Sequence, residues 1–600
     1  MKLPKIACVA TLILVAGTAC AGGRAPKTTI KLVALNDFHG QLESPGSLDG
    51  KPVGGVDWVA GYLSRLKSEN RYATVVSAGD LIGATPLVSA LFHDEPTIET
   101  MNMAGLEINA VGNHEFDEGR DELKRMQTGG CHPTDPNSCQ GAAVGAPTRR
   151  DGTFAGARFK FLAANVVDTG SGKTLFPPYV IKNYGGVRVA FIGMTLKETP
   201  TIVTPSGVAG LEFRDEAATV NALIPKLRKK RIEAIVVLIH QGGTQPVAQN
   251  ATTMNQCVGN LDGTPIKPIV NQLDDAVDLV ISGHTHQAYN CMIANRAGRE
   301  IPVTSANSIG RILTDIDLTI DRKTRDVTAV RATNIRVDRS DTTVVPDAGI
   351  KAVVDGYKAL AQPIANRVIG AVTADITRAG NAAGESPLGD VIADAQLKAT
   401  DAPGFGEAVA AFMNPGGIRA DLTYESSEAG EGAGNVTYGE GFTVQPFGNS
   451  LVTMTLTGAQ IEILLEQQFT GCGADNAPAA FNYPDGDAGQ AFDRILQVSR
   501  GFTYQWSAGG PACDKVDPAD IRLNGAPIDP AASYRITVNS FLADGGDKFH
   551  VLKLGTDRLG GAQDLDALEA WFADPEADSD PATPGVQIAP GSQDRILRLP

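Results

Sequence analysis

The sequence lacks the excess of basic residues that proteins use to bind nucleic acid polymers or anionic membranes. Its 600 residues carry 52 Lys and Arg against 68 Asp and Glu, which gives a formal net charge of -16. Phosphate backbones and anionic lipids attract clustered positive charge, so this balance argues against both kinds of partner. An acidic chain can still bind a small phosphate compound where a local cation, such as a bound metal ion, supplies the positive charge.

Beyond its N-terminus the sequence has no apolar run of the roughly 20 residues that a membrane-spanning helix needs. A basic start at Lys2 and Lys5 precedes a short apolar stretch and then several small residues. This order predicts a signal peptide over residues 1–21, and therefore export to the periplasm or the cell surface. A buried N-terminal helix is the alternative. Lipidation of Cys20 stays open, because Gly17 stands where a lipoprotein signal prefers Leu. Nothing in the sequence indicates a protein partner.

Cysteine is scarce, and no pair shows the Cys-x2-Cys spacing that is typical of structural zinc sites. Of the eight cysteines, two lie in the predicted signal peptide. The other six fall into pairs that are close in sequence, in a chain that we expect to reach an oxidising compartment. We therefore predict three disulfides rather than a zinc site: Cys131–Cys139, Cys257–Cys291 and Cys472–Cys513.

Short apolar runs rich in Val and Ile alternate with amphipathic segments in the first half of the chain. Continuous apolar runs are typical of strands that are covered on both faces, so the pattern predicts a layered α/β domain over residues 28–340. The expected strands are residues 30–35, 73–77, 187–193, 234–239 and 277–281, and the expected helices are residues 55–67 and 217–229.

A helix over residues 347–364, inside a linker of residues 341–367, is expected to join this domain to a second one. The second domain, residues 368–600, mixes strands and helices without regular alternation, which indicates an α+β domain. Its clearest expected strands are residues 452–456 and 534–538, and its clearest helices are residues 389–399 and 460–467. A tail over residues 574–591, rich in Pro, Asp and Ala, precedes a last strand.

The most distinctive polar residues of the first domain stand just past its predicted strands. In open α/β sheets the ligand crevice lies beyond the carboxyl ends of the strands, so these segments are expected to converge. A single segment of this kind is more often an ordinary turn, but five of them together predict one site. Five of the only eight histidines lie in them; the segments are residues 36–40, 79–80, 112–117, 240–242 and 283–286.

The donor atoms in these segments suit a pair of transition metals. Two carboxylates, an amide oxygen and four imidazoles supply seven ligands, enough for two ions that share one bridging group. Imidazole together with carboxylate favours Zn, Mn, Co, Fe or Ni, whereas an all-oxygen site would favour Ca or Mg. Two such ions about 3.5–4 Å apart generate a hydroxide that attacks phosphorus, and they neutralise the phosphoryl oxygens.

The five segments resemble those of the binuclear calcineurin-like metallophosphoesterases. Their order, together with the second domain, resembles the 5'-nucleotidase family, which includes periplasmic UDP-sugar hydrolases and ecto-5'-nucleotidases. The resemblance implies an N-terminal αββα metallophosphoesterase domain and a C-terminal substrate-specificity domain. It also implies the metal ligands: Asp37, His39 and His286 for one ion, Asn113, His240 and His284 for the other, and Asp80 as the bridge. Some family members have Gln in place of His286.

The same resemblance implies a catalytic role for His114, which directly follows a predicted ligand. A protonated His114 would stabilise negative charge on the transferring phosphoryl group, and Asp117, three residues later, would orient the ring. The alternative is that His114 only begins a helix and that Asp117 is a surface acid.

In the second domain the resemblance implies a nucleoside pocket. Phe447 and Phe541 would stack on the base, and Asp547 would accept hydrogen bonds from the ribose hydroxyls. Without the resemblance, core packing is the preferred interpretation of the two phenylalanines. Arg419 and Asn414 would contact the nucleotide. Family members carry one or two further arginines early in this domain, where this chain offers only Arg378.

These features predict an exported, metal-dependent phosphohydrolase that cleaves phosphate from nucleoside 5'-phosphates. Cleavage of the pyrophosphate of UDP-sugars is an additional activity that stays open. One alternative is a 2',3'-cyclic-nucleotide 2'-phosphodiesterase with 3'-nucleotidase activity, which would use the same metal site. Another is a non-catalytic nucleotide-binding surface protein, against which the complete set of ligands argues. A sulfur-oxidising branch of the superfamily, acting on thiosulfate esters, is the most distant alternative.

Overall fold

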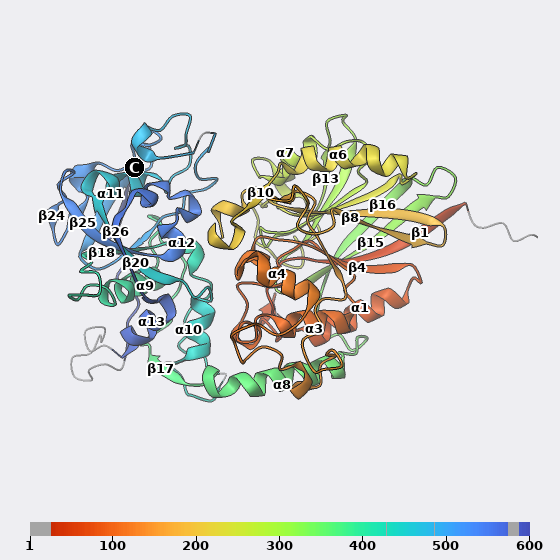
Figure 1. Ribbon diagram of the computed structural model, residues 1–600, viewed down its shortest axis with the longest axis horizontal. Helices are drawn as coiled ribbons and strands as arrows, with labels where there is room; N and C mark the ends of the chain where they lie inside the picture. The colour runs from red at the N-terminus through yellow and green to blue at the C-terminus, as the bar shows by residue number, and fades with distance from the viewer. Residues whose placement is uncertain (1–25, 204, 428, 485, 574–586) are drawn as a thin grey trace, which may run out of the picture.

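The computed structural model describes residues 26–573 and 587–600, apart from residues 204, 428 and 485. The chain forms two domains that lie side by side and are joined along one edge by helix α8 (Ala348–Ala365) (Figure 1). The predicted signal peptide, Cys20 and most of the expected tail lie outside the described residues. Within the described ranges, no helix combines the length and the apolar character that crossing a membrane requires.

Two six-stranded sheets form the centre of the N-terminal domain. The first contains, in spatial order, β16 (Val327–Arg336), β15 (Ile312–Asp321), β1 (Lys27–Leu35), β4 (Ala73–Ser77), β5 (Ile108–Ala110) and β6 (Lys160–Leu162). The second contains β13 (Ala288–Ala294), β14 (Glu300–Ala306), β12 (Leu279–Ser282), β11 (Ala234–His240), β9 (Val187–Thr195) and β8 (Tyr179–Tyr184).

The two sheets pack face to face, and helices cover their outer faces. Residues such as Leu32, Phe191 and Val236 form an apolar core between the sheets. A second core lies between the first sheet and the helices α1 (Val56–Ser68), α3 (Glu95–Ala104) and α4 (Gly119–Thr128). A third core lies between the second sheet and the helices α6 (Glu216–Lys229) and α7 (Ile266–Asn271). This is the expected αββα arrangement, and burial on both faces explains why the strands are continuously apolar.

The connecting helix α8 is packed against the N-terminal domain. The side chain of Asp347 caps it by accepting hydrogen bonds from the backbone N–H groups of Gly349 and Ile350. Its buried face, which includes Val353 and Tyr357, joins the core under α1 and α3. The Tyr357 hydroxyl donates to the buried Glu99 carboxylate over 2.8 Å. Helix α8 differs by one residue at each end from the helix expected over residues 347–364.

The C-terminal domain is α+β, as expected. One sheet contains β21 (Gln497–Val498), β18 (Ala410–Met413), β25 (Ser533–Asn539), β20 (Ser450–Thr457) and β26 (Thr556–Gln563). The other contains β24 (Ala526–Pro527), β23 (Arg522–Leu523), β22 (Phe502–Ser507) and β27 (Ile596–Leu599), the expected last strand. The helices are α9 (Pro387–Lys398), α10 (Tyr438–Val444), α11 (Gly458–Glu466), α12 (Ser540–Ala543) and α13 (Asp564–Phe572).

Smaller elements complete the two domains. The short strands are β2 (Ser47–Leu48), β3 (Lys51–Pro52), β7 (Val166–Asp168), β10 (Leu211–Phe213), β17 (Val368–Ala371) and β19 (Asn435–Thr437). The short helices are α2 (Leu87–Ala90) and α5 (Gly141–Val144). The structure also confirms the three predicted disulfides, with S–S distances of 2.09, 2.01 and 2.12 Å for Cys131–Cys139, Cys257–Cys291 and Cys472–Cys513.

A histidine beside the first disulfide makes stability depend on pH. His93 bonds Glu118 through Nδ1 over 2.6 Å and Asp135 through Nε2 over 2.9 Å. Burial lowers the pKa of His93, but these carboxylates outweigh it and raise the pKa to about 9. Because the folded pKa exceeds the unfolded value of about 6.5, the stabilisation is complete below about pH 6.5 and is lost as pH rises through 9.

We therefore expect His93→Gln to lower the free energy of unfolding by about 1–2 kcal/mol at pH 6, allowing for solvent screening of the ion pairs. At pH 10 the variant and the wild type should differ little. Urea denaturation of both proteins at the two pH values measures this. An equal difference at pH 6 and pH 10 would mean that packing, rather than charge, accounts for the effect.

Candidate functional site

The predicted metal ligands lie where neighbouring parallel strands end. Strands β1, β4 and β5 are parallel neighbours in the first sheet, and β11 and β12 are parallel neighbours in the second. Asp37, Asp80 and Asn113 follow the first three strands; His240 ends β11, and His284 and His286 follow β12. The two packed sheets therefore bring their loops to one edge, as the strand-end argument predicts.

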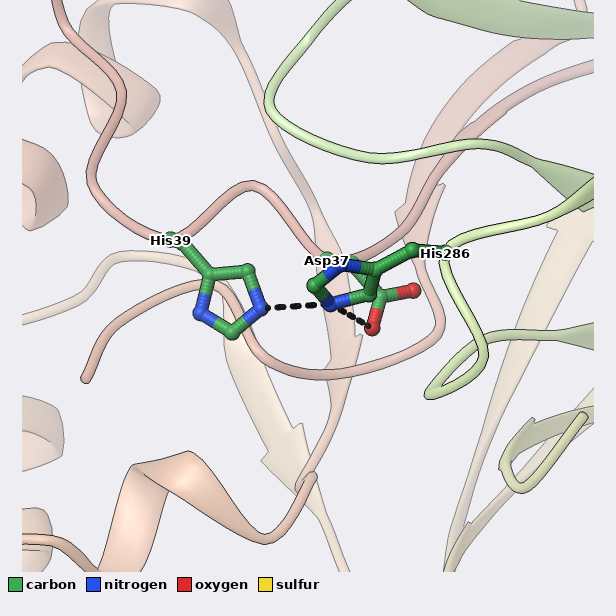
Figure 2. Close-up of side chains that lie close together, drawn as sticks. All are labelled: Asp37, His39 and His286. Atoms are coloured by element: carbon green, nitrogen blue, oxygen red, sulfur yellow. Dashed lines mark hydrogen bonds and ion pairs between the residues drawn. The ribbon is translucent and has the colours of Figure 1, made fainter. Parts of the chain in front are cut away.

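The first group of side chains consists of Asp37, His39 and His286, whose ligand atoms all lie within 4.8 Å of one another. Figure 2 shows a ring nitrogen of each imidazole pointing toward the other, with the Asp37 carboxylate beside them. The two Nε2 atoms are 3.1 Å apart. His39 donates through Nδ1 to the carbonyl of Gly83 over 2.9 Å, which leaves its Nε2 as a bare lone pair. Two facing imidazole nitrogens need a cation or a proton between them.

The second group consists of Asp80, His240 and His284 and is equally compact. His240 donates through Nδ1 to the carbonyl of Ala78 over 2.8 Å, and its Nε2 lies 2.9 Å from Asp80 Oδ2. The same Asp80 oxygen lies 3.7 Å from His39 Nε2 in the first group. Asp80 therefore stands between the two groups, as a bridging ligand must.

Asn113, the remaining predicted ligand, is 2% exposed. Its Oδ1 is buried and accepts no hydrogen bond within the described part of the chain. A buried carbonyl oxygen without a donor is costly unless a cation satisfies it. Together with the facing acceptor atoms, this orphaned oxygen shows that the donor set fits two divalent cations.

Burial favours the neutral form of two of the four predicted histidine ligands. It lowers the pKa of both His284 and His286 to about 3, so these imidazoles are neutral at neutral pH. A neutral imidazole is the form that binds a metal ion.

The loops that carry the predicted ligands are strained. Five of these ligands have left-handed backbones, with φ from 47° to 72°: Asp37, His39, Asp80, His284 and His286. Such strain is typical of functional sites.

Glu115, which the sequence analysis did not single out, holds the loops in place. Its carboxylate is buried and accepts hydrogen bonds from the backbone N–H groups of Asp80 (3.0 Å), Leu81 (2.9 Å) and Gly112 (2.6 Å). Asn109 Nδ2 donates to it as well, over 3.1 Å. Glu115 thus ties the loop after β4 to the loop after β5. Its place inside the segment that carries Asn113 and His114 was the only available signal.

His114 and Asp117 form the predicted pair. His114 Nδ1 lies 2.9 Å from Asp117 Oδ2 and 3.1 Å from Oδ1, and the backbone N–H of Ala84 also donates to Asp117. Burial lowers the pKa of His114, but the charges of Asp117 and Asp80 outweigh it, and the net pKa is raised. The ring is therefore fixed by one nitrogen and disposed to carry a positive charge.

One pocket joins this centre to the C-terminal domain. From the N-terminal domain it is lined by Asn113, His114, Asp117, Ile202, Val203 and His284. From the C-terminal domain it is lined by Asn414, Gly416, Gly417, Arg419, Phe447, Asn449, Arg494, Asn539, Phe541 and Asp547. Five of the six predicted substrate residues are among them. Arg378 is not; it lies behind Arg419, where its Nη1 donates to the carbonyl of Ile418 over 3.4 Å.

Phe447 stands at the junction of the two halves. Its ring is nearly parallel to that of His114, with the centroids 5.8 Å apart, and Arg419 Cζ lies 5.7 Å from its centroid. Phe541 packs against Gly546, next to Asp547, where a Cβ on the glycine would clash with its ring. The pocket thus presents aromatic faces, a guanidinium and a carboxylate next to the candidate metal centre.

Comparison with known proteins agrees with this geometry. The model of the calcineurin-like phosphoesterases matches residues 30–288, and that of the 5'-nucleotidase C-terminal domain matches residues 368–554. The crystal structure of a 5'-nucleotidase precursor from Thermus thermophilus is similar over 95% of this chain and 99% of that one, with a TM-score of 0.70 and 25% identity. The chain belongs to the 5'-nucleotidase family.

Two curated relatives are longer than this member of the 5'-nucleotidase family. Endonuclease YhcR of Bacillus subtilis is 31% identical over 548 residues, which cover 90% of this chain and 39% of the relative. Cell wall protein Lmo0130 of Listeria monocytogenes is 32% identical over 555 residues, which cover 89% of this chain and 65% of the relative. This chain therefore spans less than two thirds of the length of either.

The two matched models and the Thermus thermophilus structure confirm the predicted fold, which is the two-domain architecture of 5'-nucleotidases. The match to the calcineurin-like phosphoesterase model supports the predicted enzyme class. The identity and number of the metal ions, and the role of each side chain, stay predictions. The sequence motifs did not reveal Arg494, Asn449 or Asn539 as pocket residues, nor the apolar pair Ile202 and Val203. Asn449 and Asn539 lie in the segments that carry Phe447 and Phe541, whereas Arg494, Ile202 and Val203 lie in no motif that indicates a ligand.

Proposed function

We propose that this protein is an exported 5'-nucleotidase that releases phosphate from nucleoside 5'-phosphates. The observation that supports this best is one pocket lined by both domains, with Asn113 and His114 from the N-terminal domain and Phe447, Phe541 and Asp547 from the C-terminal domain. Such a pocket suits a ligand with a phosphate at one end and a flat base at the other. Export is supported by the three disulfides, since they persist in oxidising compartments.

In this proposal the two groups around Asp37 and Asp80 hold the metals, with Asp80 shared and Asn113 completing the second group. When bound, two divalent ions supply positive charge to the phosphoryl oxygens and lower the pKa of water. The protein itself contributes orientation. Asp117 holds His114 Nδ1, which leaves Nε2 free to donate a hydrogen bond to the phosphoryl group as negative charge develops on it.

The C-terminal domain contributes substrate recognition. Phe447 and Phe541 hold the base by stacking, which is worth about 1–3 kcal/mol per base in nucleic-acid systems. Asp547 accepts from the ribose hydroxyls, and Asn414 contacts the nucleotide. Arg419 places a guanidinium beside the phosphate end, with Arg378 behind it adding positive charge.

Phosphate release by the purified protein tests this function. The substrates are AMP, ATP, UDP-glucose and 2',3'-cyclic AMP, each assayed with Mn²⁺ and again with EDTA. We expect AMP to be hydrolysed fastest and EDTA to abolish the activity. Preference for the cyclic substrate would instead assign the cyclic phosphodiesterase activity. Metal-dependent release of phosphate from none of the four would contradict the proposed substrate class.

A further inference from the structure

The nucleoside end of the pocket contains an arginine that is bound to the carboxylate predicted to recognise the ribose. Arg494 lies just before β21, and its Nη1 donates to Asp547 Oδ1 over 2.6 Å. Asn414 Nδ2 donates to the other oxygen, Oδ2, over 2.9 Å. The Asp547 side chain is only 4% exposed, so these two donors replace most of its hydration. Each carboxylate oxygen therefore has one fixed protein donor.

The guanidinium of Arg494 is itself held in position. Its Cζ lies 4.5 Å from the ring centroid of Phe492, which stacks on one side of it. The backbone N–H of Arg494 donates to the carbonyl of Gln468 over 2.7 Å. The preceding residue, Asp493, accepts from both the backbone and the hydroxyl of Thr470. The side chain therefore approaches Asp547 from a fixed segment rather than from a free loop.

The backbone of Asp547 is held as firmly as its side chain. Gln490 Nε2 donates to its carbonyl over 2.5 Å, and its φ of 49° lies in the left-handed region. Asn414, the second donor, is oriented in turn by Asn539, whose Nδ2 donates to Asn414 Oδ1 over 3.0 Å. The result is one network from Arg494 through Asp547 and Asn414 to Asn539. It makes Asp547 a rigid acceptor.

We propose that Arg494 is a positioning residue that fixes the Asp547 carboxylate for a ribose diol, so that the pocket selects ribonucleotides over 2'-deoxyribonucleotides. This inference rests on the proposed function, in which Asp547 faces the ribose. Each carboxylate oxygen has two lone-pair directions, and one is already used by Arg494 or Asn414. Each oxygen therefore keeps one direction for one hydroxyl. The two oxygens match the adjacent 2'- and 3'-hydroxyls, whereas a deoxyribose leaves one of these remaining buried lone-pair directions without a donor.

Loss of Arg494 would leave a buried carboxylate with a single donor and no charge partner. A buried carboxylate that has lost its partner turns toward water, and it then no longer presents two aligned acceptors. Recognition of the sugar weakens as a result. The phosphate end of the pocket keeps His114 and the metal ligands, so the chemical step is affected far less than substrate binding.

The test compares wild type with Arg494→Met and Arg494→Lys, using AMP, 2'-deoxy-AMP and p-nitrophenyl phosphate, which has no ribose. For Arg494→Met we expect the KM for AMP to rise about tenfold or more with little change in kcat, the size expected when a buried hydrogen-bonding group is left unpaired. The preference for AMP over 2'-deoxy-AMP should fall toward one. Arg494→Lys, which keeps the charge without the planar fork, should restore part of the preference.

Arg522→Met is the matched control, because Arg522 lies on β23 and, within the described part of the chain, its side chain hydrogen-bonds only the backbone carbonyl of Gly525 in its own turn. It should behave as wild type. An unchanged preference for AMP over 2'-deoxy-AMP in Arg494→Met overturns the inference, as does an equal loss on p-nitrophenyl phosphate. A wild type that hydrolyses p-nitrophenyl phosphate but not AMP instead overturns the proposed function, and the inference with it.

Discussion

Asp80→Asn is expected to slow phosphate release from AMP by at least about 10³-fold, more than the 10–100-fold that is typical of residues that only orient metal ligands. One oxygen of Asp80 faces both groups of candidate ligands, at 2.9 Å from His240 Nε2 and 3.7 Å from His39 Nε2. Asparagine keeps the shape but removes the negative charge that two cations would share. Initial rates with saturating Mn²⁺, together with the metal content of the purified variant, measure the effect.

Asp278→Asn is a suitable control for Asp80→Asn. Asp278 is a buried carboxylate of the same domain, but it lies before β12 rather than after it and pairs with Arg299 over 2.8 Å. Its replacement should lower thermal stability while the metal-saturated rate stays near that of wild type. If Asp80→Asn keeps more than a tenth of the wild-type rate, or if Asp278→Asn loses as much activity, Asp80 is not the bridging ligand.

His114→Asn is expected to lower kcat for AMP by about 10²–10³-fold, with a smaller change in KM and no loss of bound metal. Asp117 fixes the Nδ1 side of the ring and helps to raise the pKa of His114, so the imidazole is positioned to meet charge that develops only in the transition state. Asp117→Asn keeps the imidazole but weakens its orientation, and it should cost less. Steady-state kinetics and metal analysis on the same preparations separate these effects.

His132→Asn controls for the loss of a histidine as such. His132 stacks on His93 near the first disulfide, with the ring centroids 4.2 Å apart, and it is not among the residues that line the pocket. We expect it to keep the wild-type kcat. Loss of bound metal in His114→Asn would show that His114 is a ligand instead, and an unchanged kcat would remove it from the catalytic machinery.

The sequence could predict that the candidate metal ligands lie close together, because each of them carries a local signal. Asp37, Asp80 and His240 each stand at the end of a continuous apolar strand, so their convergence follows from the topology of parallel sheets. Arg494 carries no such signal. Its side chain hydrogen-bonds Asp547, which lies 53 residues later in the sequence. Tertiary contacts, rather than a local pattern, bring the two residues together. Glu115 is an intermediate case, because its motif is recognisable but its four donors come from two different loops and from strand β5.

Strand β26 is an element of the fold that the sequence pattern could not predict. Its side chains are exposed throughout, and the segment Thr556–Gln563 contains two glycines and no apolar alternation, so no periodic pattern indicates a strand. It becomes a strand by backbone pairing with β20, with register shifts along the ladder. Strands β20 and β25, which alternate or bury their side chains, lie close to their predicted positions.

The most direct test of the central claim is a titration of Mn²⁺ into metal-stripped protein, with bound metal and AMP hydrolysis recorded in the same samples. If the groups around Asp37 and Asp80 form one centre for two ions, binding should saturate at two ions per chain, and the hydrolysis rate should rise as both are bound. Full AMP hydrolysis by the stripped protein, or saturation of the rate with one ion or none, would contradict the account.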